Sequence, residues 1–233
     1  MTEEAIRMDV DDRGVARVTI NRPQKHNAFD DTVIAELSQA FDTLANQAEV
    51  KVVILASQGK SFSAGADLNW MKRMSGYSYE ENMADGKALA GMLHTIATCP
   101  QPVIGQIQGP AYGGGVGMVS VCDIAIGVEA ASFTLSEVKL GLIPGTIAPY
   151  VVQAMGVRQA RRWFVTAERI DAHKGKELGL LHEVVADQAA LEAERDRLID
   201  MMQKNGPIAM QDSKALVLAV YNRHQAVPLN GGE

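Results

Sequence analysis

Residues 104–123 read IGQIQGPAYGGGVGMVSVCD, and this stretch does the most to decide the fold. It overlaps a short apolar strand, Val103–Ile107, continues through a glycine-rich loop, and becomes a short helix from about Gly114. A further strand is expected at Ile124–Val128. The region 103–128 carries little charge, but its glycines, proline and aspartate make it a poor membrane helix. We therefore predict a buried strand–loop–helix–strand unit.

Similar units come before this stretch. Ala16–Ile20 alternates apolar and polar residues as a half-exposed strand does, and Val52–Ala56 is an apolar run expected of a strand covered on both faces. Asp30 is a suitable N-cap for a helix whose apolar residues are spaced three or four apart. That apolar face is expected to contain Val33, Ile34, Leu37, Phe41, Leu44 and Ala48. A second helix, ended by Pro100, is expected to bury Leu89, Met92, Leu93 and Ile96. The first half thus repeats a strand–loop–helix unit, with strands stacked as turns of a spiral.

The second half is predicted to be mostly helical. The helices are expected at Gly145–Met155, Arg158–Thr166, Asp171–Leu178, Gln188–Gln203 and Pro207–Tyr221, with one short strand at Leu181–Val185. The tail Gln225–Glu233 is expected to be unstructured. No linker separates the halves, so we predict a single α/β domain over residues 1–233, with a spiral core to about residue 186 and a helical part at about 187–233.

The composition excludes several classes of protein. The chain has 233 residues, is 47% hydrophobic, and has a formal charge of −6, which is typical of a folded globular protein and gives nucleic acid no electrostatic attraction. Cys99 and Cys122 cannot form a disulfide framework or a metal site, and we expect buried free thiols in a reducing, cytoplasmic compartment. Met1–Glu4 does not begin a secretory signal, and no membrane segment is expected.

Three segments are candidates for chemistry. Ser61–Leu68 (SFSAGADL) and Gly109–Gly115 each lie between a strand and a helix, where small residues let backbone amides approach a ligand. The first is equally a tight connection with Asp67 as an N-cap. The second fits neither a dinucleotide nor a nucleotide-phosphate pattern. Ser136–Gly145 (SEVKLGLIPG) places Glu137 in an apolar stretch, either as a salt-bridged structural residue or as an acid catalyst.

Taken together, these segments resemble the enoyl-CoA hydratase/isomerase (crotonase) family over nearly the whole chain. Asn21–Phe29 (NRPQKHNAF) resembles its early loop that binds coenzyme A (CoA), SFSAGADL its first oxyanion loop, residues 104–123 its signature segment, and SEVKLGLIPG its catalytic glutamate segment. The residues around Asn69–Met71 and Ile147–Val151 look closest to bacterial methylglutaconyl-CoA hydratase-like members. The resemblance implies a crotonase (ClpP-like) spiral of strand–strand–helix units.

The resemblance also implies roles for single residues. The backbone N–H groups of Ala66 and Gly114 would polarise the thioester carbonyl, and Gly114 also opens a helix whose positive end favours an enolate oxygen. Glu137 would be the acid/base. Its apolar neighbours Val138, Leu140 and Leu142 are expected to raise its pKa by desolvation. Substrate and CoA would be bound by the residues that match the family's loops, namely Lys25, Ala28, Ala64, Gly65, Asp67, Leu68 and Gly113. No metal and no cofactor beyond the CoA of the substrate are implied.

Gly117 is the main departure from the family pattern. The second glutamate of the family's hydratases would fall here, and a glycine cannot transfer a proton. Tyr112, Thr146 and Tyr150 are candidates for the missing group. A lone glutamate also resembles the family's Δ3,Δ2-enoyl-CoA isomerases.

We therefore predict a lyase that hydrates a short or branched 2-enoyl-CoA, with 3-methylglutaconyl-CoA as the specific candidate. The alternatives are a Δ3,Δ2-enoyl-CoA isomerase and a non-catalytic scaffold that binds acyl-CoA. His26 is expected to face solvent, and Lys72 and Arg73 either face solvent or meet a substrate carboxylate or a CoA phosphate. The resemblance implies a homotrimer or a hexamer built as a dimer of trimers, with no nucleic-acid or membrane partner. The resemblance implies further helices beyond the match to Glu233 that cover the acyl pocket, and relative to the family a short C-terminal part is expected.

Overall fold

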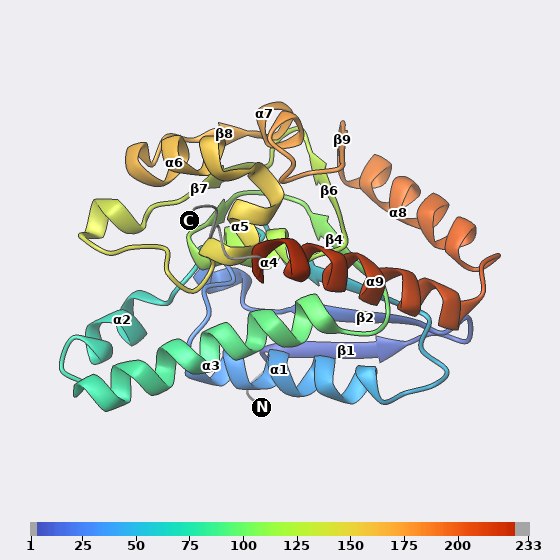
Figure 1. Ribbon diagram of the computed structural model, residues 1–233, viewed down its shortest axis with the longest axis horizontal. Helices are drawn as coiled ribbons and strands as arrows, with labels where there is room; N and C mark the ends of the chain where they lie inside the picture. Colours follow the sequence, from blue (N-terminus) through green and yellow to red (C-terminus); the bar gives the residue numbers. More distant parts are fainter. Residues whose placement is uncertain (1–3, 227–233) are drawn as a thin grey trace, which may run out of the picture.

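A mostly parallel six-stranded sheet lies at the centre of the described residues, 4–226, of the computed structural model (Figure 1). Its strand order is β1-β2-β3-β4-β6-β9, and only β1 and β2 pair antiparallel. The strands are β1 (Ile6–Val10), β2 (Val15–Ile20), β3 (Val52–Ser57), β4 (Val103–Ile107), β6 (Ile124–Val128) and β9 (Glu183–Val185). Strands β3, β4 and β6 confirm the sequence-based expectations, because their apolar runs are buried almost throughout. Strand β2 is also present, but the expected half-exposure is wrong, because β2 lies between β1 and β3 and even Thr19 is buried.

A second, three-stranded sheet in the order β5-β7-β8 joins the turns of the spiral. Its strands are β5 (Ala111–Tyr112), β7 (Ser132–Thr134) and β8 (Ile170–Asp171). Two turns contribute one strand to each sheet, with β4 followed by β5 and β6 followed by β7, whereas the turn after β3 contributes only an isolated bridge between Ser63 and Ala111. The implied strand–strand–helix unit is confirmed, and the strand–loop–helix pattern is corrected, because strands of two or three residues carry no periodicity.

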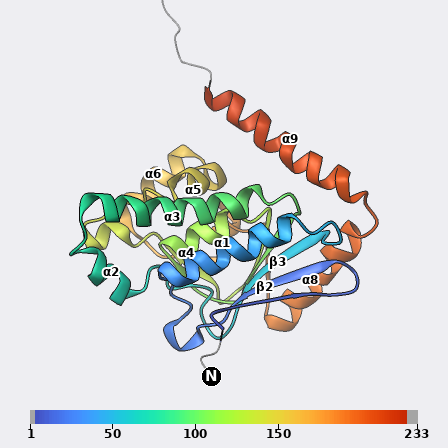
Figure 2. The same cartoon turned by 90° about the horizontal axis from the view of Figure 1, so that it is seen from below.

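Helices α1 (Asp31–Ala45) and α3 (Tyr79–Thr98) pack side by side across one face of the large sheet (Figure 2). Asp30 caps α1 as expected, accepting a hydrogen bond from the Val33 N–H at 3.2 Å. The helix ends at Ala45, so Ala48 lies outside it. A separate short helix, α2 (Leu68–Met74), precedes α3, which starts at a capping box formed by Ser78 and Glu81.

The rest of the chain is largely helical, as predicted. The remaining helical elements are η1 (Pro23–Lys25), α4 (Gly114–Ser120), η2 (Glu137–Leu140), α5 (Ala148–Met155), α6 (Val157–Thr166), α7 (Ala172–Glu177), α8 (Gln188–Met202) and α9 (Pro207–Ala226). Helix α9 extends beyond Tyr221 and includes Gln225, which corrects the expected start of the unstructured tail. Residues 227–233 of that tail lie outside the described residues. Both cysteines are buried free thiols, as predicted.

Helix α9 stands apart from the rest of the fold along much of its length (Figure 2). A cavity of about 910 Å³ lies beneath it, against Cys122, Tyr150 and Gln153. Lys214 ties the helix to the body: its ammonium group is 2.7 Å from Asp123 and donates to the Gln101 carbonyl at 3.3 Å. Among the described helices, none is long and apolar enough to cross a bilayer.

The Lys214–Asp123 pair gives a first prediction. Lys214 is 9% exposed and Asp123 is 29% exposed, and the Asp123 carboxylate also accepts from the Val103 N–H at 2.7 Å. Lys214→Met leaves that carboxylate without its counter-ion, and we expect it to lower the free energy of unfolding by about 1–3 kcal/mol. Asp123→Asn/Lys214→Met should recover part of this loss in chemical denaturation. A double variant no more stable than Lys214→Met would contradict the pairing. The control is Lys204→Met, which removes an exposed lysine near α9 and should leave stability close to that of wild type.

Candidate active site

A cavity of about 240 Å³ forms where three loops meet: the loop after β3, the loop after β5, and the segment around η2. It brings together most of the predicted site residues, namely Ala64, Gly65, Ala66, Leu68, Gly113, Gly114 and Glu137. The other lining residues are Phe29, Met71, Leu89, Ser136, Leu140, Leu142, Ile143, Pro144, Thr146 and Ile147. The cavity is therefore apolar, and Glu137 is the ionisable side chain in its described lining.

The N–H group of Ala66 is free to face this cavity. Ala66 pairs with Phe29 in an isolated parallel bridge, in which Phe29 N–H donates to Gly65 O at 2.9 Å and Asp67 N–H donates to Phe29 O at 2.8 Å. These bonds use the groups on either side of Ala66, so its own N–H points away from Phe29. No acceptor for this N–H is found in the described part of the chain.

Gly114 supplies a second free N–H group. It is the first residue of α4, so its amide precedes the internal hydrogen bonds of the helix, and it has no acceptor within residues 4–226. An ideal Cβ on Gly65 would lie 2.7 Å from the carbonyl oxygen of Tyr112 and 3.6 Å from the Gly114 nitrogen. The two loops therefore touch backbone to backbone. Within the second loop, Gly113 has a φ of +48°, a left-handed backbone conformation that favours glycine.

Glu137 lies beside the second loop. It is the first residue of η2, and its Oε1 is 3.0 Å from the position that a Cβ on Gly113 would take. Its Oε2 is buried without a hydrogen-bond partner, and Glu137 forms no ion pair with any described residue. Burial raises the pKa of Glu137, as predicted. Of the apolar neighbours expected to bury it, Leu140 and Leu142 line the cavity with Glu137.

The three side chains proposed to replace the missing second carboxylate differ in whether they line the cavity. Thr146 lines the cavity, whereas Tyr112 and Tyr150 do not. Tyr150 lines the larger cavity beneath α9 instead. Sequence reasoning also missed Phe29 and Ile147 as lining residues. Phe29 had a signal in its place within the early loop, but Ile147 had none that separates it from ordinary core.

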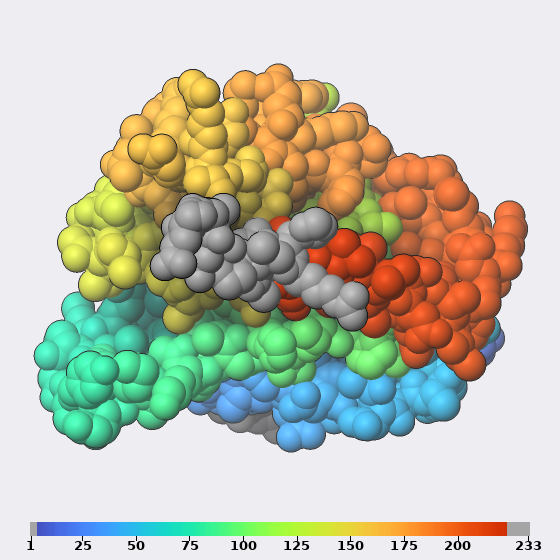
Figure 3. All heavy atoms as spheres, viewed as in Figure 1, coloured from blue at the N-terminus to red at the C-terminus, as the bar shows by residue number. Residues whose placement is uncertain are grey.

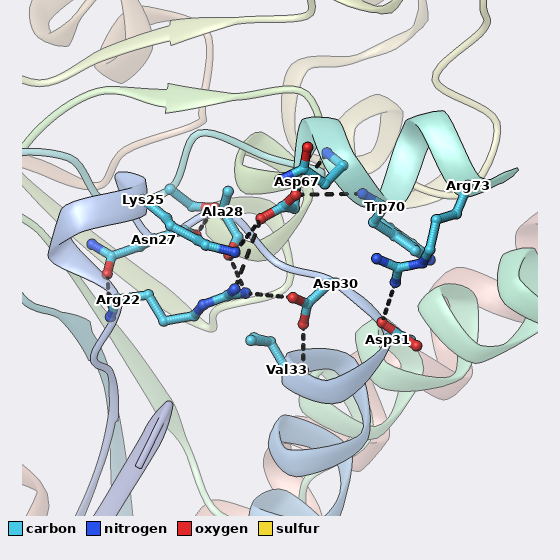
Figure 4. Close-up of polar contacts among 12 residues, drawn as sticks. Arg22, Lys25, Asn27, Ala28, Asp30, Asp31, Val33, Asp67, Trp70 and Arg73 are labelled. Atoms are coloured by element: carbon cyan, nitrogen blue, oxygen red, sulfur yellow. Dashed lines mark hydrogen bonds and ion pairs between the residues drawn. The ribbon is translucent and has the colours of Figure 1, made fainter. Parts of the chain in front are cut away.

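Lys25, Ala28 and Asp67 lie outside the cavity lining, next to it, in a charged network (Figure 4). Asp67 is 6% exposed and caps α2, accepting from the N–H groups of Asn69 at 2.8 Å and Trp70 at 3.4 Å. Lys25 Nζ is 3.0 Å from Asp67, and Arg22 lies 3.0 Å from Asp30 and 3.8 Å from Asp67.

This network fixes the first loop to the start of α2. Burial by itself raises the pKa of Asp67, but the Lys25 ammonium and the two amides outweigh burial and hold it below its ordinary value. Asp67 is therefore charged, and it is the N-cap that the sequence allowed as an alternative. His26 is exposed as expected, with its Nδ1 3.1 Å from Ser61 Oγ. Lys72 and Arg73 are exposed on α2, and Arg73 pairs with Asp31 at 2.9 Å.

The described residues contain no group of three or more His, Cys, Asp or Glu side chains placed to hold a metal ion.

Comparison with known proteins agrees with this geometry. Residues 11–228 match the family described as enoyl-CoA hydratase/isomerase. An enoyl-CoA hydratase of Alternaria alternata is 35% identical over 209 residues, covering 90% of this chain and 68% of the relative. The mitochondrial methylglutaconyl-CoA hydratase of Mus musculus is 30% identical over 224 residues, covering 93% and 70%. The crystal structure of an enoyl-CoA hydratase from Shewanella pealeana superposes with a TM-score of 0.91 at 40% identity, covering 95% of this chain and 82% of that one.

The burial of Glu137 makes stability depend on pH. Because its pKa is raised above the ordinary value of 4.5 in the folded state, the folded protein binds this proton more tightly than the unfolded chain. The resulting stability is present below the ordinary value and is lost as pH rises through the folded-state pKa. Glu137→Gln removes this titration, so we expect its midpoint of thermal unfolding to exceed that of wild type increasingly towards neutral pH. Glu129→Gln, at an exposed glutamate, should follow wild type at every pH; a Glu137→Gln difference independent of pH would refute the assignment.

Proposed function

The chain belongs to the enoyl-CoA hydratase/isomerase family, and we propose that it adds water to the double bond of a short or branched 2-enoyl-CoA thioester. The observation that carries this proposal is the convergence of two acceptor-free backbone N–H groups and one unpaired carboxyl oxygen on a single apolar cavity. The N–H groups can stabilise a negative charge that develops on an oxygen, and the carboxyl group can accept and donate a proton.

In this proposal, the thioester carbonyl oxygen accepts hydrogen bonds from the N–H groups of Ala66 and Gly114. As water attacks Cβ, electrons move from the double bond to this oxygen, and the two donors stabilise the enolate. Each such donor is typically worth about 3–4 kcal/mol of the barrier. The start of α4 at Gly114 adds a favourable partial positive charge.

Glu137 would then carry the proton. Its carboxylate accepts a proton from the attacking water as the C–O bond forms, and the protonated group delivers it to Cα, which restores the carboxylate. A raised pKa suits this task, because a group that both accepts and donates works best when its pKa is near the working pH. No cofactor besides the CoA of the substrate enters these steps.

The CoA portion is proposed to leave the cavity past Ala64, Gly65 and Leu68 and along the loop that carries Lys25 and Ala28. Lys25 supports this path, since its side chain is 44% exposed and has donors to spare beyond its pairing with Asp67. Asp67 would act by holding the loop and Lys25 in place.

Double-bond isomerisation is the second candidate reaction. It is favoured by one observation: Glu137 has no second carboxyl group beside it in the described lining. Moving a proton between two carbons needs one base and a stabilised enolate, but no activated water. The two reactions are separated by supplying 2-enoyl and 3-enoyl esters and following which one is consumed.

For the acyl group, we propose 3-methylglutaconyl-CoA, which would place the enzyme in leucine breakdown. The similarity to the mouse methylglutaconyl-CoA hydratase supports this substrate. Its free carboxylate needs a cation, and the cavity lining described here supplies none. Lys72 is exposed and follows Leu68, which lines the cavity, by one helical turn of α2. We therefore propose Lys72 as the partner of a carboxylate that extends out of the cavity past Leu68.

We further propose that the protein works in the cytoplasm as a trimer or a hexamer. The two buried free thiols fit a reducing compartment. Helix α9 supports assembly, because it exposes apolar side chains to solvent, with Ile208 at 71%, Leu216 at 64% and Val217 at 65% exposed.

Glu137→Gln tests the reaction. The amide retains the shape of the carboxyl group but transfers no proton, so we expect kcat for a 2-enoyl-CoA ester to fall by about 10²–10⁴-fold. Affinity for a saturated acyl-CoA should stay close to that of wild type, because that ligand needs no proton transfer. The measurements are loss of the conjugated thioester absorbance and calorimetric binding.

A Glu137→Gln rate above about a third of wild type would remove Glu137 from the mechanism. If wild type binds acyl-CoA but neither consumes enoyl esters nor exchanges solvent deuterium into Cα, the protein is a scaffold and the proposed reaction is wrong.

Lys72→Gln tests the substrate. If Lys72 meets the distal carboxylate, the variant should raise KM for 3-methylglutaconyl-CoA by about tenfold, the loss of roughly one charge-assisted hydrogen bond. KM for 3-methylcrotonyl-CoA, which lacks that carboxylate, should hardly change. Arg73→Gln is the matched control on the same helix, since Arg73 pairs with Asp31. Equal effects of Lys72→Gln on both esters would argue against a carboxylated substrate.

A further inference from the structure

Gly117 packs against Ile147, a residue of the cavity wall. An ideal Cβ on Gly117 would lie 2.4 Å from Ile147 Cγ2 and 2.9 Å from Ile147 Cβ. Ile147 is 1% exposed and lines the cavity together with Glu137. The isoleucine side chain therefore fills the volume that any side chain at position 117 would need.

Ile147 cannot simply move aside. It directly precedes α5, and its carbonyl accepts hydrogen bonds from the N–H groups of Tyr150 and Val151, each at 3.1 Å. Rotation about χ1 would carry Cγ2 away, but it would leave Cβ in place, and the Cβ contact alone is too short. Leu93 Cδ1 lies 3.7 Å from the same Cβ position, so a side chain at position 117 would also contact α3. Ile147 therefore excludes a side chain at position 117 whichever χ1 rotamer it adopts.

The apolar residues around Ile147 would also disfavour a second carboxylate in the cavity. Leu89, Leu142, Ile143 and Pro144 line the cavity with it. Apart from Glu137, the polar side chains in the described lining are the hydroxyl groups of Ser136 and Thr146. A carboxylate at position 117 would therefore be desolvated without a partner, which costs several kcal/mol.

We infer that Ile147 is a specificity-determining residue: it limits the site to the single carboxyl group of Glu137 and thereby sets the balance between hydration and double-bond isomerisation. This inference rests on the proposed function. In isomerisation, Glu137 takes a proton from Cα of a 3-enoyl ester, the electrons move to the thioester oxygen, and the same proton returns to Cγ. Hydration additionally needs a water held against Cβ, and Glu137 must hold it without a second carboxylate, because the apolar wall at Ile147 offers that water no hydrogen bond.

The experiment compares Gly117→Glu, Ile147→Gly and the double variant Gly117→Glu/Ile147→Gly. Ile147→Gly removes both clashing atoms, and the new glutamate takes up a volume similar to that of the lost isoleucine. Gly117→Glu alone should lower the midpoint of thermal unfolding by about 4 °C or more and weaken binding of butanoyl-CoA. The double variant should regain much of both losses. Gly91→Glu is the control, because a Cβ there meets nothing within 4 Å and Gly91 is exposed on α3.

Activity is the second measurement. In the double variant, the ratio of 2-enoyl hydration to 3-enoyl isomerisation should rise at least about tenfold over that of Ile147→Gly, because a second carboxylate can orient water. If Gly117→Glu does not fold, Gly117→Ala with and without Ile147→Gly makes the same comparison of stability and binding.

Two results would overturn the inference. One is a variant at position 117 as stable as wild type, or no gain on adding Ile147→Gly. The other is an unchanged reaction ratio in a folded double variant that binds butanoyl-CoA. If wild type and all variants bind butanoyl-CoA but turn over neither ester, the proposed function fails instead, and the stability comparison still decides whether Ile147 blocks position 117.

Discussion

The site depends on a close approach of two loops that leaves no room for side chains between them. A Cβ on Gly65 would lie 2.7 Å from the Tyr112 carbonyl oxygen, and a Cβ on Gly115 would lie 2.7 Å from the Ser63 carbonyl oxygen. The first loop follows β3, and the second follows β4 and contains the short strand β5; β3 and β4 are parallel neighbours in the large sheet, so their ends meet at the same edge. Ala66 and Gly114 both line the cavity, and the N–H group of neither has an acceptor among the described residues.

The charged network beside the first loop holds that loop in position against the second loop. Asp67 is nearly buried, caps α2 and pairs with Lys25, so one side chain joins the loop, the helix and η1 (Figure 4). In the space-filling view, α2 lies at one end of the molecule beside the segment around residues 138–145, and both border the cavity (Figure 3). A lost cap costs a helix about 1 kcal/mol in general. Here the same loss would also free the loop that presents the Ala66 N–H.

The sequence predicted features whose causes are local or periodic, and missed those that depend on contacts between distant residues. The Asp30 cap, the buried runs of β3 and β4, and the glycine loop before α4 all have signals within a few residues. The break between α2 and α3 was missed, because the capping box of Ser78 and Glu81 that starts α3 was not recognised. Strand β8 was also missed, since two residues give no pattern.

The same distinction holds within the candidate site. The resemblance led to Glu137, Ala66 and Gly114, and these residues do share one cavity. Tyr150 was as plausible as Thr146 in the sequence, yet it faces the cavity beneath α9, because the turn of α5 carries it to the other side. The contact between Gly117 and Ile147 joins α4 to the start of α5. Only the folded structure shows that the Ile147 side chain occupies the space left by the absent side chain of Gly117.

This packing explains why a site with unsatisfied groups is compatible with a stable fold. The buried Oε2 of Glu137 lacks a donor, and two backbone N–H groups lack acceptors. Leaving the buried Oε2 unpaired opposes folding by about 1–3 kcal/mol. A thioester would supply the missing acceptor, and a water molecule or an acidic C–H would supply the missing donor. The groups that folding leaves unpaired are thus those that a substrate would complete, and the core around Phe29, Phe41 and Leu93, buried to 1% exposure or less, offsets their cost. Filling the Glu137 side of the cavity with a permanent partner would stabilise the protein and remove the property that makes the carboxyl group useful.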